Sequence, residues 1–213
     1  GSWAQTGGTF NERSGTVILD PSAAVNLMPL TTAAGNFYNL TLNDGLLAYW
    51  KLDESGAVNR MDAKGNGSSD LVTNSSLGAV NGTRNGAANF TRTRIQFLNV
   101  TDQNFPSLGN ISFTFAAWAY LDSLPSSGDA TIAAKYGSSG ADSANREHLL
   151  GYRASGENRF WFLTCSNAGC GGEVGADRTG QASITTGTWY YVVAWHDKEN
   201  GTISLQVNNG RVN

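Results

Sequence analysis

The chain has 213 residues, of which 40% are hydrophobic and 15% charged, and its formal net charge is −3. Its largest basic cluster is the pair Arg92 and Arg94, so it lacks the positively charged surface of proteins that bind nucleic acids or anionic membranes. No apolar run approaches the ~18 residues of a membrane-spanning helix. The 26 glycines, set with Asn, Ser and Thr between short aromatic or β-branched runs, predict a turn-rich all-β fold.

Residues 1–43 differ from the rest of the chain and are predicted to form a short N-terminal β segment. Three short strands bury little apolar surface alone, so we expect this segment to need a partner. The segment resembles the units of long repetitive bacterial surface proteins, through its runs GTF, GTV and NLT. The predicted strands are 16–20, 25–30 and 37–42.

The remainder, residues 44–213, is predicted to be a β-sandwich domain whose first strand covers 46–52. Alternation in this strand places Trp50 and Leu52 on one face and Tyr49 on the other. The alternation stops at Asp53, where turn-forming residues begin.

Further strands are expected at regular intervals, with polar or glycine-rich loops at 137–146 and 169–180 and a short helix at 143–150. The run at 111–121 has apolar residues at both odd and even positions. This predicts a strand in the middle of a sheet with both faces covered. The predicted strands are 87–100, 111–121, 131–136, 149–152, 159–165, 188–195 and 201–207. In 188–195, one face carries Trp189, Tyr191, Val193 and Trp195.

Cys165 and Cys170 are separated by four small or turn-forming residues, which makes a local disulfide sterically reasonable. Such a bond would imply an oxidising, extracytoplasmic compartment. Free thiols are the alternative. A metal site is disfavoured because it needs about four ligands, and His148 and His196 are the other soft donors.

Several pieces of the chain, in this order, resemble the laminin G-like, concanavalin A-type jelly roll of bacterial extracellular proteins. The resemblance runs from Leu46 to the C-terminus and implies an all-β sandwich of two antiparallel sheets, one of them concave. The pieces are LLAYWKLDESG, MDAKGNG, AANFTRTRIQF, ISFTFAAWAY, TIAAKYG and GTWYYVVAWHDKENGTISLQVNNG.

The chain departs from this family in two places. Residues 90–95 read FTRTRI where the family usually has acidic residues, which weakens any acidic site inherited there. The family also continues past the strand that ends here near Gly210, so we expect the domain to lack its usual last strands. The exposed sheet edges could be closed by residues 1–43, by a strand from a neighbouring copy, or by sequence outside this chain.

The loop after the first predicted strand is rich in oxygen ligands. Calcium takes about six to eight oxygens from carboxylates, amides and carbonyls on flexible loops, and many relatives in the resembled family carry a structural calcium near this position. The same side chains could instead form Asx-turns with their own backbone. The predicted calcium ligands are Asp53, Asp62, Asn66 and Asp70.

Sugar sites on such folds combine aromatic faces with a few polar groups. Most of the six tryptophans must nevertheless pack in the core. The candidate ligand contacts are Trp161, Tyr190, Tyr152, Trp118, Arg146, Glu147 and Arg153.

Catalysis is not expected. Jelly-roll glycosidases need paired carboxylates on one strand face, whereas Asp53 and Glu54 are adjacent and point to opposite faces. A Ser-His-Asp set has no nucleophile-elbow motif to support it. We therefore expect a non-enzymatic, extracellular adhesion module that binds a glycan or protein, with calcium as its one expected cofactor. The alternative is a structural subunit of a filament whose neighbouring copies exchange strands.

Overall fold

The computed structural model describes residues 16–19, 39–42, 45–54, 56, 58–64, 69–125, 128–136, 146–154, 158–165, 173–177, 184–210 and 212. These residues contain thirteen strands and one short 3-10 turn, so the predicted all-β fold is confirmed. Within this part of the chain, no helix is long and apolar enough to cross a membrane.

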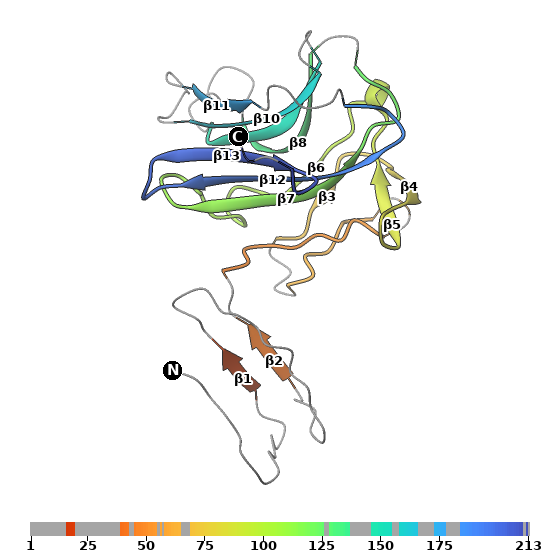
Figure 1. The fold of residues 1–213 in the computed structure, drawn as a ribbon. Helices are drawn as coiled ribbons and strands as arrows, with labels where there is room; N and C mark the ends of the chain where they lie inside the picture. The colour runs from red at the N-terminus through yellow and green to blue at the C-terminus, as the bar shows by residue number, and fades with distance from the viewer. Residues whose placement is uncertain are drawn as a thin grey trace, which may run out of the picture.

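Two antiparallel sheets form the body of the domain and face each other (Figure 1). The four-stranded sheet has the order β11-β10-β9-β8, and the three-stranded sheet has the order β13-β12-β7. The strands of the first are β8 (Asp129–Lys135), β9 (His148–Arg153), β10 (Arg159–Cys165) and β11 (Glu173–Asp177). Those of the second are β7 (Phe113–Tyr120), β12 (Trp189–Asp197) and β13 (Thr202–Val207).

The hydrophobic core fills the space between these two sheets. Strands β7, β9, β10, β12 and β13 contribute alternate side chains to it, because successive residues of a strand point to opposite faces. Burying a large apolar side chain contributes ~1.5–3 kcal/mol, so this layer is the main source of stability. Its fully or nearly fully buried members are Leu150, Tyr152, Phe160, Phe162, Ile184, Val192, Ala194, Leu205 and Val207.

Three smaller strand pairs lie outside the sandwich sheets. β3 (Val72–Thr73) pairs with β6 (Leu98–Asn99), and β4 (Gly78–Asn81) pairs with β5 (Gly86–Asn89), both antiparallel. β1 (Thr16–Leu19) and β2 (Asn39–Leu42) pair in parallel, and Figure 1 draws them away from the two main sheets. The described parts of β1 and β2 pair only with each other. The division at residue 43 and the missing last strands therefore stay predictions.

The strand predicted at 46–52 is wrong. Residues 45–49 have no ladder, and Trp50 makes only an isolated bridge to Asp62. Leu52 has a φ of 60°, a left-handed conformation that no regular strand accepts. The backbone N–H of Tyr49 donates to the Asp62 carboxylate at 2.9 Å, so a side chain takes the place of a neighbouring strand.

The single strand predicted at 87–100 is also wrong, because the chain turns within it. β5 ends at Asn89, the 3-10 turn η1 covers Arg92–Arg94, and β6 begins at Leu98. Ile95 has a φ of 47° and is 80% exposed. The apolar pattern that predicted one strand thus spans a turn whose isoleucine faces solvent.

Three further predictions need correction. The helix at 143–150 is wrong over its described part, since His148 begins strand β9. The loop at 169–180 contains strand β11. Among the described residues β7 does not lie mid-sheet: it ends the three-stranded sheet, and its outward side chains are exposed. The strands predicted at 149–152, 159–165, 188–195 and 201–207 are confirmed.

Candidate functional site

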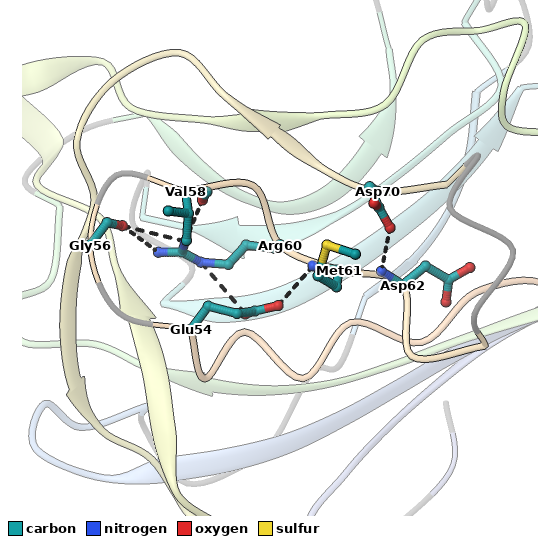
Figure 2. Close-up of polar contacts among 7 residues, drawn as sticks. All are labelled: Glu54, Gly56, Val58, Arg60, Met61, Asp62 and Asp70. Atoms are coloured by element: carbon teal, nitrogen blue, oxygen red, sulfur yellow. Dashed lines mark hydrogen bonds and ion pairs between the residues drawn. The ribbon is translucent and has the colours of Figure 1, made fainter.

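The loop of residues 53–64 is held by buried side chains (Figure 2) and by two isolated backbone bridges, Trp50–Asp62 and Arg60–Leu71, rather than by a continuous ladder. Arg60 is completely buried, and its guanidinium donates to the carbonyls of Val58 at 2.5 Å and Gly56 at 3.3 Å. Its Nε lies 3.8 Å from the Glu54 carboxylate, which also accepts the N–H of Met61 at 2.7 Å. A buried guanidinium surrounded by carbonyls and one carboxylate fixes the path of the loop.

Two of the four predicted calcium ligands, Asp62 in this loop and Asp70 beyond it, are joined by a hydrogen bond (Figure 2). Asp70 accepts the backbone N–H of Asp62 at 2.8 Å. Asp62 is 3% exposed, and its Oδ1 accepts the N–H groups of Tyr49 and Lys64 at 2.9 and 3.0 Å. The bond to Lys64 is the Asx-turn that the sequence allowed. Oδ2 of Asp62 is buried without a hydrogen-bond partner.

The other two predicted ligands are not brought to this point in the described residues. The Asp53 carboxylate accepts a hydrogen bond from Asn85 at 3.3 Å, beside the start of β5. Asn66 lies outside the described residues. No group of three or more His, Cys, Asp or Glu side chains that could hold a metal is found among the described residues. The unpartnered oxygen of Asp62 therefore suits a cation, whereas the other unpartnered carboxylate oxygen of this loop, Oε2 of Glu54, faces the Arg60 guanidinium.

The candidate ligand contacts Tyr152 and Tyr190 point into the core. Tyr152 is 2% exposed and its hydroxyl donates to Asn158. The ring of Tyr190 packs against Phe160 with 5.5 Å between centroids, and its hydroxyl accepts the N–H of Thr185 at 3.0 Å. Neither ring is presented to a ligand in solution.

Trp161 and Arg153 lie together on the opposite face of the four-stranded sheet. The Arg153 guanidinium lies 3.8 Å from the centroid of the Trp161 ring, and its Nε lies 3.5 Å from Asp129. Trp161 is 5% exposed, so this ring face is already covered by the cation. Arg146 stacks on Tyr136 at 4.6 Å. The predicted residues therefore form no single contact surface.

An aromatic surface lies instead on the outer face of the three-stranded sheet. Trp118 and Tyr120 of β7 are 53% and 43% exposed. Each packs against a half-buried ring of β12, Trp118 against Tyr191 at 5.1 Å and Tyr120 against Trp189 at 5.2 Å between centroids. The strand register places these residues directly opposite each other. We call the outward side chains of β7, β12 and β13 the aromatic face.

The sequence analysis named Trp118 as a candidate contact but missed the other three rings of this cluster, Tyr120, Trp189 and Tyr191. The alternation of β12 had already placed Trp189 and Tyr191 on one face, and the register with β7 was the unknown. Cross-strand register depends on tertiary pairing, which one sequence does not reveal.

Glu147, another candidate contact, is committed to holding a loop. Its carboxylate accepts hydrogen bonds from the Ser107 hydroxyl at 2.5 Å and from the N–H groups of Leu108 at 2.9 Å and Gly109 at 3.3 Å. It also lies 2.7 Å from the Lys135 ammonium. Burial opposes ionisation of Glu147, but the ammonium and these donors outweigh it and hold the pKa at about 2.

His148, the next residue, points into the sandwich between Phe113 and Phe115, with ring centroids 5.6 and 4.8 Å away. It is 4% exposed, and burial lowers its pKa to about 4. His196 lies on the three-stranded sheet, where its Nδ1 is 2.7 Å from the carbonyl oxygen of Ile111. Both histidines therefore make contacts that support the fold.

Cys165 ends β10, and the described residues contain no free cysteine. Cys170 lies outside them. The Cys165–Cys170 disulfide stays a prediction.

Comparison with known families identifies a domain over the second half of the chain. Residues 92–212, more than half of the chain, match a laminin G-like family model described as the concanavalin A-like lectin/glucanases superfamily. The matched range includes both sandwich sheets but not the acidic loop of Figure 2. No curated protein and no solved structure gives a significant match.

Proposed function

Because the chain belongs to the concanavalin A-like lectin/glucanase superfamily through a laminin G-like domain, we propose that it is a non-catalytic, extracellular adhesion domain that binds carbohydrate on its aromatic face. The observation that carries this proposal is the pair of exposed rings, Trp118 and Tyr120, each backed by a second ring of β12. Exposed aromatic clusters on soluble domains mark interaction sites.

The chemistry of sugars suits such a surface. One side of a pyranose ring presents C–H groups, which are apolar and pack on an aromatic ring, while its hydroxyls need polar partners at the rim. The neighbouring strand β13 supplies such partners, since Ser204 and Gln206 lie opposite Trp195 and Val193. A protein ligand would use the same rings, and binding assays separate the two.

The absence of catalysis is part of the proposal. Three carboxylates at the ends of the sandwich strands are engaged in structural contacts: Asp129 with Arg153, Glu147 with Lys135, and Asp197 with Asn200. Glu147 does share the Lys135 ammonium with Asp102, but its carboxylate also accepts hydrogen bonds from Ser107, Leu108 and Gly109, so it is not available as a general acid or nucleophile.

Replacing Trp118 with alanine is expected to weaken carbohydrate binding about tenfold or more. A stacked aromatic anchor is worth roughly 1–2 kcal/mol, and Trp118 is the most exposed ring of the aromatic face. A glycan array would identify ligands of the native chain, and titration calorimetry would then compare the Kd of Trp118→Ala with that of the native chain.

Phe90→Ala is the matched control, because Phe90 is 46% exposed but lies beyond the end of β5, outside the three-stranded sheet. It should leave the Kd unchanged. An array without signal, or equal losses in both variants, would remove the support for a sugar site on this face.

We also propose that a calcium ion binds at Asp62 and Asp70. The support is the buried Oδ2 of Asp62, which needs a cation or a donor that the described residues do not supply. Added Ca²⁺ is expected to raise the Tm of the native chain by several degrees, and Asp62→Asn should abolish the increase. Differential scanning calorimetry with and without a chelator measures both. Equal increases in the two proteins would contradict a site at Asp62.

The second candidate function, a subunit of a strand-exchanging assembly, rests on β7. In the described part of the chain β7 ends its sheet, has no charge or proline, and pairs with β12 without a register shift. The opposite sheet ends in β8, which carries Asp129, Lys135 and a register shift after Thr131. Unprotected edges accept further strands.

If copies associate through this edge, Ala116→Lys should disperse them, because a charge on an edge strand opposes pairing. Ala116 is an outward, exposed residue of β7. Sedimentation velocity over a range of concentrations would show assemblies for the native chain and monomers for the variant. A native chain that stays monomeric throughout would rule out this candidate.

A further inference from the structure

We propose that the aromatic face selects an uncharged polysaccharide chain over an acidic one, and that the chain lies along β12. The inference rests on the proposed function, because it specifies the class of sugar bound at the same face. It follows from the charges on the face and from the spacing of its rings.

The outward residues of β7, β12 and β13 are almost free of charge. Of their described side chains, Asp197 alone is ionisable near neutral pH, and it lies at the end of β12. The remaining outward residues are aromatic, small or neutral polar: Thr114, Ala116, Trp118, Tyr120, Trp189, Tyr191, Val193, Trp195, Thr202, Ser204 and Gln206.

The Asp197 carboxylate is occupied by the turn that follows it. It accepts hydrogen bonds from the N–H groups of Glu199 and Asn200 at 3.0 and 3.1 Å, and from the Asn200 side chain at 2.6 Å. These bonds, with Asn200 the largest contributor, hold the pKa of Asp197 below its usual range. The carboxylate therefore caps a turn, and its negative charge would repel an acidic sugar.

An acidic polysaccharide would lose part of the hydration of its carboxylates or sulfates on this face and would find no cation there to replace it. Such uncompensated desolvation is costly. The two arginines that lie on rings, Arg153 on Trp161 and Arg146 on Tyr136, are not on this face: Arg153 belongs to β9 of the four-stranded sheet, and Arg146 lies just before that strand. A neutral chain has only hydroxyls to satisfy, which Ser204 and the free oxygen end of Gln206 can do.

The rings of β12 are arranged for an extended ligand. Trp189, Tyr191 and Trp195 point outward at positions i, i+2 and i+6, which corresponds to about 7 Å and then about 13 Å along the strand. The polar residues of β13 lie beside the Trp195 end of this row, and Trp118 and Tyr120 lie beside Tyr191 and Trp189 at its other end. A single small sugar would use one ring, whereas a linear chain reaches all three.

The test compares a neutral β-glucan with its carboxymethylated derivative, two soluble polymers that share one backbone and differ in charge. Affinity electrophoresis and calorimetry would measure their binding to the native chain at about 50 mM and about 500 mM salt. We expect the neutral polymer to bind at least tenfold more tightly at low salt, with a Kd that does not change with salt.

Two variants sharpen the comparison. Trp195→Ala, which removes the distant ring, should weaken binding of the polymer but not of a short oligosaccharide held at Tyr191. Ser204→Lys, which adds a cation beside the row, should tighten binding of the carboxymethylated polymer several-fold and lose this gain at high salt. Phe90→Ala should change none of these values.

Equal or stronger binding of the acidic polymer by the native chain would overturn this inference and leave the proposed function standing. Loss of binding for the polymer and the short oligosaccharide alike in Trp195→Ala would overturn the alignment along β12. Binding of neither polymer, together with an empty glycan array, would remove the proposed function itself.

Discussion

Replacing Glu147 with alanine is expected to lower the free energy of unfolding by about 3 kcal/mol. The substitution leaves the N–H groups of Leu108 and Gly109 without their acceptor and removes the carboxylate 2.7 Å from Lys135. Leu108 is 2% exposed, so its N–H has little access to water. Losing one partner of such a network costs about 1–3 kcal/mol for each unsatisfied group. Urea unfolding near pH 7 measures the difference.

Asp102→Ala is the matched control for this contact. Asp102 lies 2.6 Å from the same Lys135 ammonium, but its side chain is 74% exposed. Exposed ion pairs are worth about 0–1 kcal/mol, so this variant should remain close to the native chain. Similar losses in the two variants would mean that charge on Lys135, and not the anchored loop, accounts for the effect.

The same residue predicts how stability changes in acid. The pKa of Glu147 is about 2 in the fold and near 4.5 in the unfolded chain. Its contribution is therefore complete above about pH 4.5 and is lost as the pH falls toward 2. His148, whose pKa is about 4 because it is buried, adds a loss between about pH 6.5 and 4. Glu147→Ala should remove the loss below about pH 4.5, and because the Glu147 carboxylate also acts to raise the pKa of His148, the loss due to His148 should extend to lower pH.

Replacing Gly151 with alanine is expected to cost about 2–3 kcal/mol. A Cβ at this position would lie 2.7 Å from the carbonyl oxygen of Ala130 and 3.3 Å from Nε1 of Trp161. The first atom is backbone of β8 beside its register shift, so it cannot move without disturbing the ladder. Overpacking of this kind typically destabilises by about 1–3 kcal/mol. Thermal and urea unfolding would both report the loss.

Gly78→Ala is the control substitution in a strand. Its added Cβ would meet side-chain atoms of Asn89 at 3.5 Å, an ordinary contact, and its φ is not in the left-handed region. We expect a change within about 0.5 kcal/mol. Equal behaviour of the two alanine variants would mean that the backbone near Ala130 yields more easily than its position suggests.

The parts of the fold that the sequence predicted well are those with regular alternation. In β12, Val192 and Ala194 are buried while Trp189 and Tyr191 face outward, as two-residue periodicity requires. The apolar pattern did not predict which residues of β7 are exposed, because its outward residues are as aromatic as its inward ones. Exposure of Trp118 reflects a surface feature, which hydrophobicity alone cannot distinguish from a second buried face.

The candidate sites were predicted less well, because they depend on contacts between distant segments. Asp62 and Asp70 were named from local turn chemistry and do meet, since they are close in sequence. Trp161 was named as a sugar contact, but its ring is covered by Arg153 from the adjacent strand. The buried role of Arg60 left no sign in the sequence, because its partners are backbone carbonyls.

The outer surface of the three-stranded sheet carries one charge in its described strands, that of Asp197, and this affects how fast a ligand binds. A neutral ligand feels no long-range attraction to this surface, so we expect association at the unsteered rate of about 10⁵–10⁶ M⁻¹s⁻¹. A low association rate limits the affinity of a single copy for its ligand. Several copies on one cell or fibre would engage together, and avidity would then supply the attachment strength that a single surface lacks.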